Sequence, residues 1–367
     1  MSHHINTADF SYHMPSQIVF GTDKLHQLAH HVKGRKTLLI TSKGFVARGL
    51  VEQITEILPN LVGVYSDIPS HPEFTDLEAA YQQVHQHDFE LLLAIGGGSV
   101  LDATKYFSVY NDTAPQPKNA QFVSAIIKGT HPKSHYQLTP IIAVPTTAGT
   151  GSEITPWATV WDKQEKKKYS LHLPDLFPEV ALYDARLTLS VPKAITIQTG
   201  LDTLSHALES IWNKNANEIT IRYAIQAAKL VITYLPLLAN DLNNLNYRTQ
   251  LLKACMYSGL AFSNTQTALA HAMSYYITNH KGIDHGLACS FTLPMLIDLI
   301  IGQHEFIDKA LMEIFGDLSS DKLRAMFKTL NISTSFSDYG ISNDELAEIK
   351  ASLGNTQRAG NSLVILN

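Results

Sequence analysis

Four side chains in the second half of the chain have types and spacings that suit a bound metal ion. Asp202 and His206 stand four positions apart, which on a helix places both on one face. His271 lies in an apolar segment, and His285 is followed directly by Gly286. Three imidazoles and one carboxylate suit Fe²⁺ or Zn²⁺ and leave room for one substrate oxygen. Each histidine could instead be an ordinary core or surface residue, and Asp202 and His206 could be a simple hydrogen-bonded pair.

A glycine-rich turn at 95–102, IGGGSVLD, lies between an expected strand and an expected helix. Glycines let the backbone approach an anion and adopt positive φ angles, and the start of a helix offers unpaired N–H groups. The turn therefore indicates a diphosphate site at the carboxyl end of a strand. The alternative is a plain strand-to-helix turn in which Ser99 and Asp102 cap the helix. The turn is not the GxGxxG fingerprint.

A second loop of similar character, PTTAGTGSE at 145–153, also follows an expected strand. Its hydroxyls and glycines suit a loop that wraps a ribose-phosphate or the edge of a nicotinamide. It could also be an ordinary loop that ends in a helix cap at Ser152. Two such loops after strands of the same domain favour a nucleotide site.

These loops require a parallel sheet, and the first half of the chain has the pattern of one. Short apolar runs, typical of strands buried on both faces, occur at 37–41, 61–65, 91–95 and 141–144. Helix-length segments are expected at roughly 45–57, 74–87 and 99–109. This alternation predicts a doubly wound α/β dinucleotide-binding domain over residues 1–186, with a polar surface excursion at 111–133.

The second half has few strand signals. Long amphipathic segments occupy 192–213, 217–240, 246–262 and 267–280, so residues 187–367 are expected to form an all-helical domain that carries the candidate metal ligands. The segment 183–192 is expected to hold a last strand and a connector.

The composition restricts the function further. With 367 residues, 45% of them hydrophobic, the chain has material for two packed cores. A net charge of −5 argues against nucleic acid or an anionic membrane as partner. Two cysteines cannot form a disulfide framework, which favours a reducing compartment such as the cytoplasm. The apolar runs are too short for a membrane span, and no signal peptide is expected.

Taken in order, the two loops, the Asp-x-x-x-His pair and the His…His-Gly pair resemble the iron-containing (group III) alcohol dehydrogenases. The resemblance extends from PSQIVFG at 15–21 to at least Pro294. It implies an NADH- or NADPH-linked oxidoreductase acting on a small alcohol or aldehyde, a cleft between the two domains and a homodimer. It implies that a ferrous ion, for which Zn²⁺ could substitute, is held by Asp202, His206, His271 and His285.

The resemblance also assigns the cofactor contacts. It places Gly97, Gly98, Ser99 and Asp102 at the diphosphate and nicotinamide, Thr146 and Thr147 along the dinucleotide, and Lys168 near the cofactor. Members that prefer NAD often have an aspartate where this chain has Ser42. Ser42, followed by Lys43, therefore predicts that NADPH is accepted alongside NADH, although Lys43 could equally be a solvated surface lysine.

Two positions depart from the family pattern, and they bear on substrate and mechanism. His71 replaces the asparagine of an Asn-Pro pair. Tyr275 stands where many members carry a histidine that helps to relay a proton, so it either donates a proton or lines the pocket.

Three stretches indicate a substrate. FSYHMPSQIVFG, TPWATVWD…KKYSL and ALAHAMSYYIT…HGLAC are similar to phosphonoacetaldehyde reductases, which form 2-hydroxyethylphosphonate. His280 and Lys281 are candidates to bind the phosphonate, or are an exposed loop tip. The alternatives are a general medium-chain alcohol dehydrogenase or lactaldehyde reductase, and a non-catalytic metal- and nucleotide-binding protein.

Overall fold

The computed structural model describes residues 9–111, 119–165, 167–353 and 356–366. Its contacts divide the chain into two compact units. The sheet unit comprises Pro15–Thr147 and Ser152–Thr188, and the helical unit comprises Met1–Met14, Ala148–Gly151 and Leu189–Asn367. The sequence placed a single boundary after residue 186, whereas the structure assigns two earlier short segments to the helical unit.

The sheet unit is built on six parallel strands in the order β1-β10-β7-β4-β2-β3. The four predicted apolar runs all lie in this sheet, and β1 and β10 complete one edge. The strands are β1 Gln17–Gly21, β2 Thr37–Ile40, β3 Leu61–Tyr65, β4 Leu91–Gly96, β7 Ile141–Pro145 and β10 Val180–Asp184.

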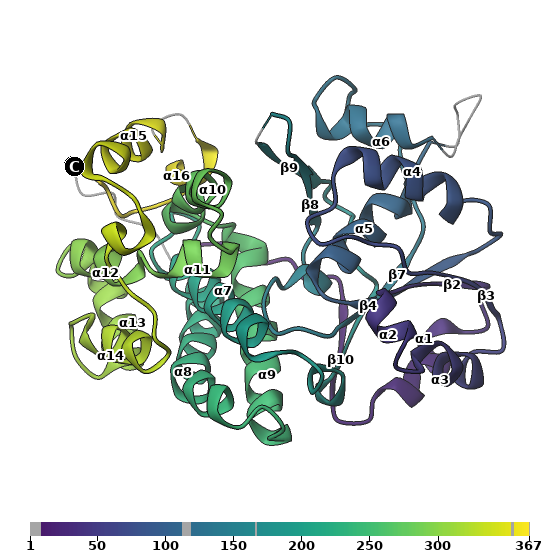
Figure 1. Ribbon diagram of the computed structural model, residues 1–367, viewed down its shortest axis with the longest axis horizontal. Coiled ribbons are helices and arrows are strands. Elements are labelled where there is room, and N and C mark those ends of the chain that lie inside the picture. Colours follow the sequence, from purple (N-terminus) through teal and green to yellow (C-terminus); the bar gives the residue numbers. More distant parts are fainter. Residues whose placement is uncertain (1–8, 112–118, 166, 354–355, 367) are drawn as a thin grey trace. The chain divides into compact units, whose positions relative to one another are not determined.

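Helices cover both faces of the sheet, which confirms the doubly wound α/β fold (Figure 1). Alternate residues of a strand point to opposite faces. In β2, Leu38 packs toward the α4–α6 side and Leu39 toward the α1–α3 side. The helices are α1 Leu28–Val32, α2 Lys43–Val46, α3 Leu50–Ile57, α4 Phe74–Val84, α5 Gly98–Ser108 and α6 Ala120–Ile127, with 3₁₀ turns η1 Leu25–Gln27, η2 Ser152–Ile154 and η3 Ala185–Thr188.

The structure differs from the sequence-based expectations in three places. The helix expected at 45–57 is broken into α2 and α3 by Gly49, whose φ of 80° is left-handed. The expected polar excursion contains α6, because Val123 and Ile126 bury an apolar face there; residues 112–118 lie outside the described ranges. Two antiparallel pairs were missed: β5 Val109–Tyr110 with β6 Gln137–Leu138, and β8 Trp157–Asp162 with β9 Lys167–His172.

The helical unit is all-helical in its described ranges, as expected, and surrounds one large apolar core. Within those ranges no helix is both long and apolar enough to cross a bilayer. Its helices are α7 Lys193–Ile211, α8 Glu218–Asn240, α9 Leu245–Thr265, α10 Leu269–Lys281, α11 His285–Ser290, α12 Leu293–Ile300, α13 Glu305–Phe315, α14 Asp321–Thr329, η4 Phe336–Tyr339, α15 Asn343–Leu353 and α16 Gln357–Gly360.

Candidate metal and nucleotide sites

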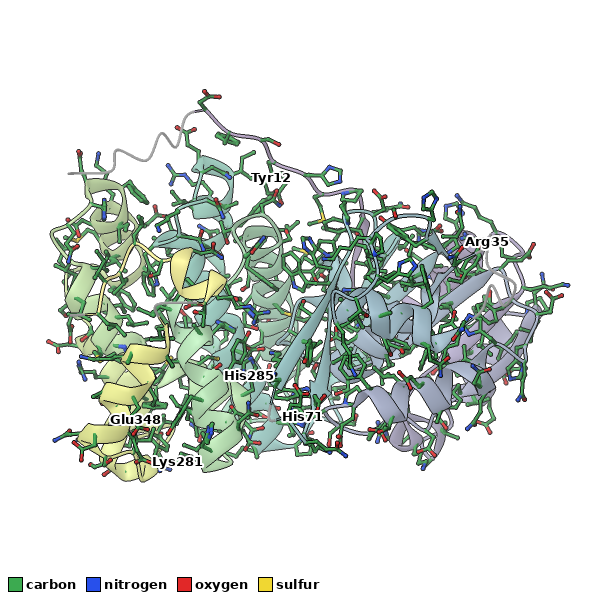
Figure 2. The ribbon with its side chains drawn as sticks, turned by 90° about the horizontal axis from the view of Figure 1, so that it is seen from above. Tyr12, Arg35, His71, Lys281, His285 and Glu348 are labelled. Carbon is green, nitrogen blue, oxygen red and sulfur yellow. The ribbon has the colours of Figure 1, made fainter. Side chains whose placement is uncertain are left out.

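Helices α7, α10 and α11 pack together and bring three of the four predicted metal ligands to one point. Asp202, His271 and His285 each place a potential ligand atom within 4.8 Å of the others, and Cys289 Sγ joins the same group. Asp202, His271 and Cys289 are buried, while His285, which Figure 2 labels, is half-buried. A carboxylate and two imidazoles in a buried cluster form a donor set that fits a divalent transition metal.

His206 is not among these mutually close ligand atoms, and its place as the fourth ligand stays a prediction. The i, i+4 spacing brings it to the right face of α7, and its Nδ1 lies 3.9 Å from Asp202 Oδ1. Its ring, however, stacks on Phe262 at 4.1 Å and on His271 at 4.4 Å between centroids. These two stacking contacts fix the plane of the ring, whereas spacing along a helix fixes only the face on which the side chain begins.

The sequence analysis missed Cys289 as a neighbour of this cluster. Its Sγ lies 3.6 Å from Asp202 Oδ1 and 3.4 Å from the carbonyl oxygen of Gly286. Burial, reinforced by the Asp202 carboxylate, raises the pKa of the Cys289 thiol. The sequence feature that could have revealed Cys289 is its position four residues after His285, which is one helical turn along α11.

Glu209 was also missed, and it is the residue that orients His271. Its carboxylate is wholly buried and accepts a hydrogen bond from His271 Nδ1 at 2.6 Å. It also accepts from the backbone amides of Ala268, Ala270 and His271. With Nδ1 held in this way, His271 Nε2 faces Asp202 Oδ1 at 3.3 Å. The signal was again spacing, since Glu209 follows Asp202 by two helical turns.

The charges of the cluster support one another. Burial alone would raise the pKa of Asp202, but the imidazoles of His206, His271 and His285 hold it well below its usual range. Burial alone would lower the pKa of His271, and the Glu209 and Asp202 carboxylates raise it instead. The cluster therefore keeps an ionised carboxylate in a buried place, as a cation site requires.

Gly286 explains how α11 can present His285 to α7. A Cβ atom at this position would lie 2.0 Å from the backbone carbonyl oxygen of Gln198, well inside van der Waals contact. Only glycine allows this approach of the two helices, and the approach places His285 beside α7. The His-Gly pair seen in the sequence thus has a packing cause.

In the sheet unit, the candidate nucleotide residues meet where strand order reverses. The chain runs from β2 outward to β3 and then back to β4 on the other side of β2. Ligands of open α/β sheets bind at the carboxyl ends of strands at such a point. Ser42 follows β2, and the 95–102 turn follows β4. Thr41 Oγ1 ties the two ends together by donating to Ile95 O at 2.8 Å.

The glycines of the turn at 95–102 allow its backbone to pack closely against neighbouring side chains. None of Gly96, Gly97 and Gly98 has a positive φ, so the turn does not use that freedom of glycine. A Cβ at Gly96 would lie 2.5 Å from Val100 Cβ, and one at Gly97 would lie 3.4 Å from Thr147 Oγ1. The turn is therefore pressed against both its own helix and the neighbouring loop. Thr146 joins the two by donating its backbone N–H to Gly96 O at 3.0 Å.

Asp102 and Ser99 are engaged within the sheet unit and do not form the helix-capping pair. Gly97 is the N-cap residue of α5. Asp102 accepts from Ser152 Oγ at 2.6 Å and from the Thr159 amide at 2.9 Å. Burial raises the pKa of Asp102, although Lys105 and Lys168 oppose the shift. Ser99 Oγ accepts from the backbone N–H of His71 at 3.4 Å, a residue with a left-handed φ of 55°.

The buried side chain of Lys105 binds the end of the 145–153 loop and the residues that follow it. Its buried ammonium donates to the carbonyl oxygens of Ser152, Thr155 and Trp157 at 2.5, 2.8 and 2.8 Å. Lys168, the other candidate lysine, stands on β9 with its Nζ 5.4 Å from the centre of the Trp161 ring.

Tyr275 lies beside the metal cluster on α10, with its ring parallel to that of His285 at 6.1 Å. Arg358 stands over the Tyr275 ring, its Cζ 4.8 Å from the ring centre. The candidate phosphonate residues have other partners: Lys281, labelled in Figure 2, pairs with Glu345 at 2.5 Å, and His280 stacks on Tyr276. Lys43 pairs with Asp67 at 2.6 Å in an exposed position.

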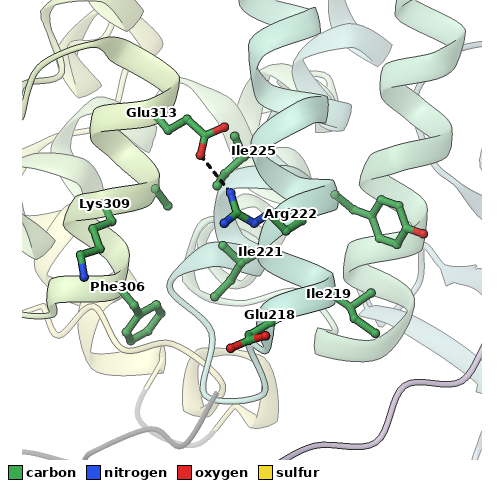
Figure 3. A pocket seen from close by; sticks show the side chains of 10 residues that line it. Glu218, Ile219, Ile221, Arg222, Ile225, Phe306, Lys309 and Glu313 are labelled. Atoms are coloured by element: carbon green, nitrogen blue, oxygen red, sulfur yellow. Dashed lines mark hydrogen bonds and ion pairs between the residues drawn. The ribbon is translucent and has the colours of Figure 1, made fainter. Parts of the chain in front are cut away.

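A separate groove of about 770 Å³ lies between α8 and α13, where Arg222 pairs with Glu313 at 3.3 Å (Figure 3). Its lining includes Ile221, Ile225 and Phe306 and none of the candidate site residues. We assign no role to it.

Comparisons with known proteins agree with this geometry. Residues 15–185 match the family model for iron-containing alcohol dehydrogenases, and residues 196–361 match the C-terminal model of the same family. A 1-propanol dehydrogenase of Citrobacter freundii is 31% identical over 71% of this chain, which spans 66% of that protein's length. A sulfoacetaldehyde reductase of Bilophila wadsworthia is 26% identical to this chain. The match covers 92% of this chain and 90% of the length of that reductase.

Among solved structures, a sulfoacetaldehyde reductase of Bifidobacterium kashiwanohense in complex with NAD⁺ is similar to this chain. It has a TM-score of 0.88 and 28% identity, over 98% of this chain and 96% of that one. The matched models cover both units, and the candidate residues stand within them. The chain therefore belongs to the iron-containing alcohol dehydrogenase family.

Proposed function

We propose that this protein reduces a small aldehyde to an alcohol, with a nicotinamide as hydride donor and a divalent metal in the helical unit. The observation that carries the proposal is the convergence of Asp202, His271 and His285 within 4.8 Å, in a chain that matches the family over both units. In the balanced reaction, aldehyde, NAD(P)H and a proton yield alcohol and NAD(P)⁺.

The donor set fits Fe²⁺, the metal of the family name, and Zn²⁺ also suits it. Asp202, His271 and His285 would hold the ion, with His206 as the fourth ligand. When bound, the metal polarises the aldehyde oxygen as a Lewis acid and the nicotinamide supplies the hydride. The chain's part is to keep Asp202 ionised and His271 oriented through Glu209.

For the cofactor, we infer that NADPH is accepted alongside NADH. Ser42 places no carboxylate directly after β2, where one would repel a 2′-phosphate. Lys43 would attract that phosphate, and its pairing with Asp67 reduces the attraction. A preference for NADH of more than about a hundredfold in kcat/KM, equal to about 2.7 kcal/mol, would overturn this inference.

For the substrate, we infer a two-carbon aldehyde that carries an anionic group, with phosphonoacetaldehyde as the first candidate. The sulfoacetaldehyde reductases that resemble this chain over most of its length support the class, because a sulfonate and a phosphonate are both tetrahedral oxyanions. The similarity to a 1-propanol dehydrogenase favours the second candidate, a general alcohol dehydrogenase.

Tyr275 is assigned to the wall of the substrate pocket. Its ring lies against His285 and under Arg358, which are packing contacts. If Tyr275 instead donates the proton, Tyr275→Phe will lower kcat and remove a basic limb from its pH profile; a lining role leaves the shape of the profile unchanged.

The test is an anaerobic assay of the iron-loaded protein with phosphonoacetaldehyde, sulfoacetaldehyde, lactaldehyde, propanal and butanal, each with NADH and NADPH. We expect oxidation of the nicotinamide that chelation abolishes and that is fastest with the anionic aldehydes. Turnover of these no better than that of propanal or butanal refutes the substrate class. No turnover of any aldehyde would favour a non-catalytic binding protein.

A further inference from the structure

Arg358 differs from every other arginine of the helical unit. Arg222 and Arg324 each pair with a carboxylate, and Arg248 donates to two backbone carbonyls and a threonine hydroxyl. Within the described ranges, the guanidinium of Arg358 has no hydrogen-bond or ion-pair partner. This half-buried guanidinium therefore offers five N–H donors to a ligand without first having to break a contact within the described ranges.

Its surroundings connect it to the metal cluster. The Tyr275 ring lies under the guanidinium and parallel to His285, which belongs to that cluster. The carboxylate oxygens of Glu209, the acid that acts on Arg358 electrostatically, are already occupied by His271 and by backbone amides. Burial lowers the pKa of Arg358 to about 10, so the group remains a cation at neutral pH.

The backbone that carries Arg358 is pinned on both sides. Thr356 Oγ1 caps α16 by accepting from the Ala359 amide at 3.3 Å. Asn361 Nδ2 donates to Thr267 O at 3.1 Å, and the Leu363 amide donates to Trp212 O at 2.9 Å. These bonds fix the backbone at Arg358, and the contact with the Tyr275 ring restricts the guanidinium, so less entropy is lost when a ligand binds.

We propose that Arg358 binds the anionic end of the aldehyde substrate, a phosphonate or sulfonate group one carbon away from the carbonyl. The proposal rests on the proposed function, because it assumes that the carbonyl oxygen is directed to the Asp202, His271 and His285 cluster. The Tyr275 ring is near both groups, with its centre 4.8 Å from Arg358 Cζ and 6.1 Å from the centre of the His285 ring, so a short substrate suits the site. A guanidinium offers two parallel N–H donors to a tetrahedral oxyanion, and Tyr275 orients its plane.

The experiment compares Arg358→Gln and Arg358→Lys with the wild-type holoenzyme, with Arg324→Gln as a matched control on a surface ion pair. The readout is the ratio of kcat/KM for phosphonoacetaldehyde or sulfoacetaldehyde to kcat/KM for propanal. We expect the ratio to fall about a hundredfold in Arg358→Gln, mainly through KM, and about tenfold in Arg358→Lys, which keeps the charge and loses the paired donors. Arg324→Gln should leave it unchanged.

Calorimetry with ethylphosphonate and ethanesulfonate supplies a second readout that does not depend on turnover. Both should bind the wild-type holoenzyme and lose affinity in the Arg358 variants at unchanged metal content. A wild-type preference for anionic aldehydes that persists in both variants overturns the role of Arg358 while the proposed function stands. A wild type without that preference refutes the proposed substrate class and the role of Arg358 together. If Arg358→Gln fails to fold, Arg358→Lys and the calorimetry decide.

Discussion

Glu209→Gln is expected to weaken metal binding without unfolding the protein. The carboxylate of Glu209 fixes His271 through Nδ1 at 2.6 Å and accepts three backbone amides. Glutamine keeps one acceptor oxygen and replaces the other with an N–H donor, so some of these four hydrogen bonds are lost. Residues that orient a ligating histidine in this way typically contribute about ten- to a hundredfold in affinity, which is about 1.4–2.7 kcal/mol.

Alanine would be the wrong choice at this position. It would leave four buried donors without an acceptor, at about 1–3 kcal/mol each. Their sum approaches the whole free energy of unfolding of an ordinary domain, about 5–15 kcal/mol. The conservative variant therefore isolates the effect on the metal.

The assay is competition with a chelator of known affinity, using Zn²⁺ or Co²⁺ and the intact chain. Glu348→Gln, which makes the same chemical change on the exposed face of α15 (Figure 2), is the matched control. A Glu209→Gln protein with wild-type thermal stability and a metal Kd within about twofold of wild type, less than 0.5 kcal/mol, would refute this reasoning.

Three further outcomes follow from the same structure. Lys105→Met should destabilise the protein by about 2–5 kcal/mol in urea unfolding, because two buried carbonyls and one part-buried carbonyl lose their donor; a loss below about 1 kcal/mol would mean that water replaces the ammonium. Asp67→Asn should lower KM for NADPH relative to NADH, since it releases Lys43, and an unchanged ratio would place the 2′-phosphate elsewhere. His206→Ala should reduce the metal content of the purified protein more than Cys289→Ser; the reverse order would make the thiol the fourth ligand.

Much of the fold could be read from the chain because strands buried on both faces are continuous apolar runs. The runs that became β2, β3, β4 and β7 have this character. Strand β1 at the sheet edge is only partly buried, and the β8–β9 hairpin mixes aromatic and charged residues. Neither therefore has the continuous apolar pattern that predicts a buried strand. Helix α6 was hidden by the polar residues that flank its short apolar segment.

The site could be predicted only as far as spacing allows. The helical pair Asp202 and His206 is visible because both residues lie on one helix. The proposed role of Arg358 cannot be seen in the sequence. This residue lies on a helix of four residues near the end of the chain, and its role depends on tertiary contact with Tyr275. The orientation of the His206 ring is likewise set by packing against Phe262, which spacing along the helix does not reveal.

The two units are interlaced along the chain, which constrains how the molecule is made and dissected. The chain passes from one unit to the other after Met14, Thr147, Gly151 and Thr188. During synthesis the last residue of the sheet unit emerges before α7 exists, so the tetrapeptide 148–151 must wait for its partner. Thr203 of α7 later donates to the carbonyls of Ala148 and Gly149 at 3.2 and 3.3 Å. A fragment that starts at Leu189 would lack those acceptors, so the helices with the candidate metal ligands are better studied in the intact chain.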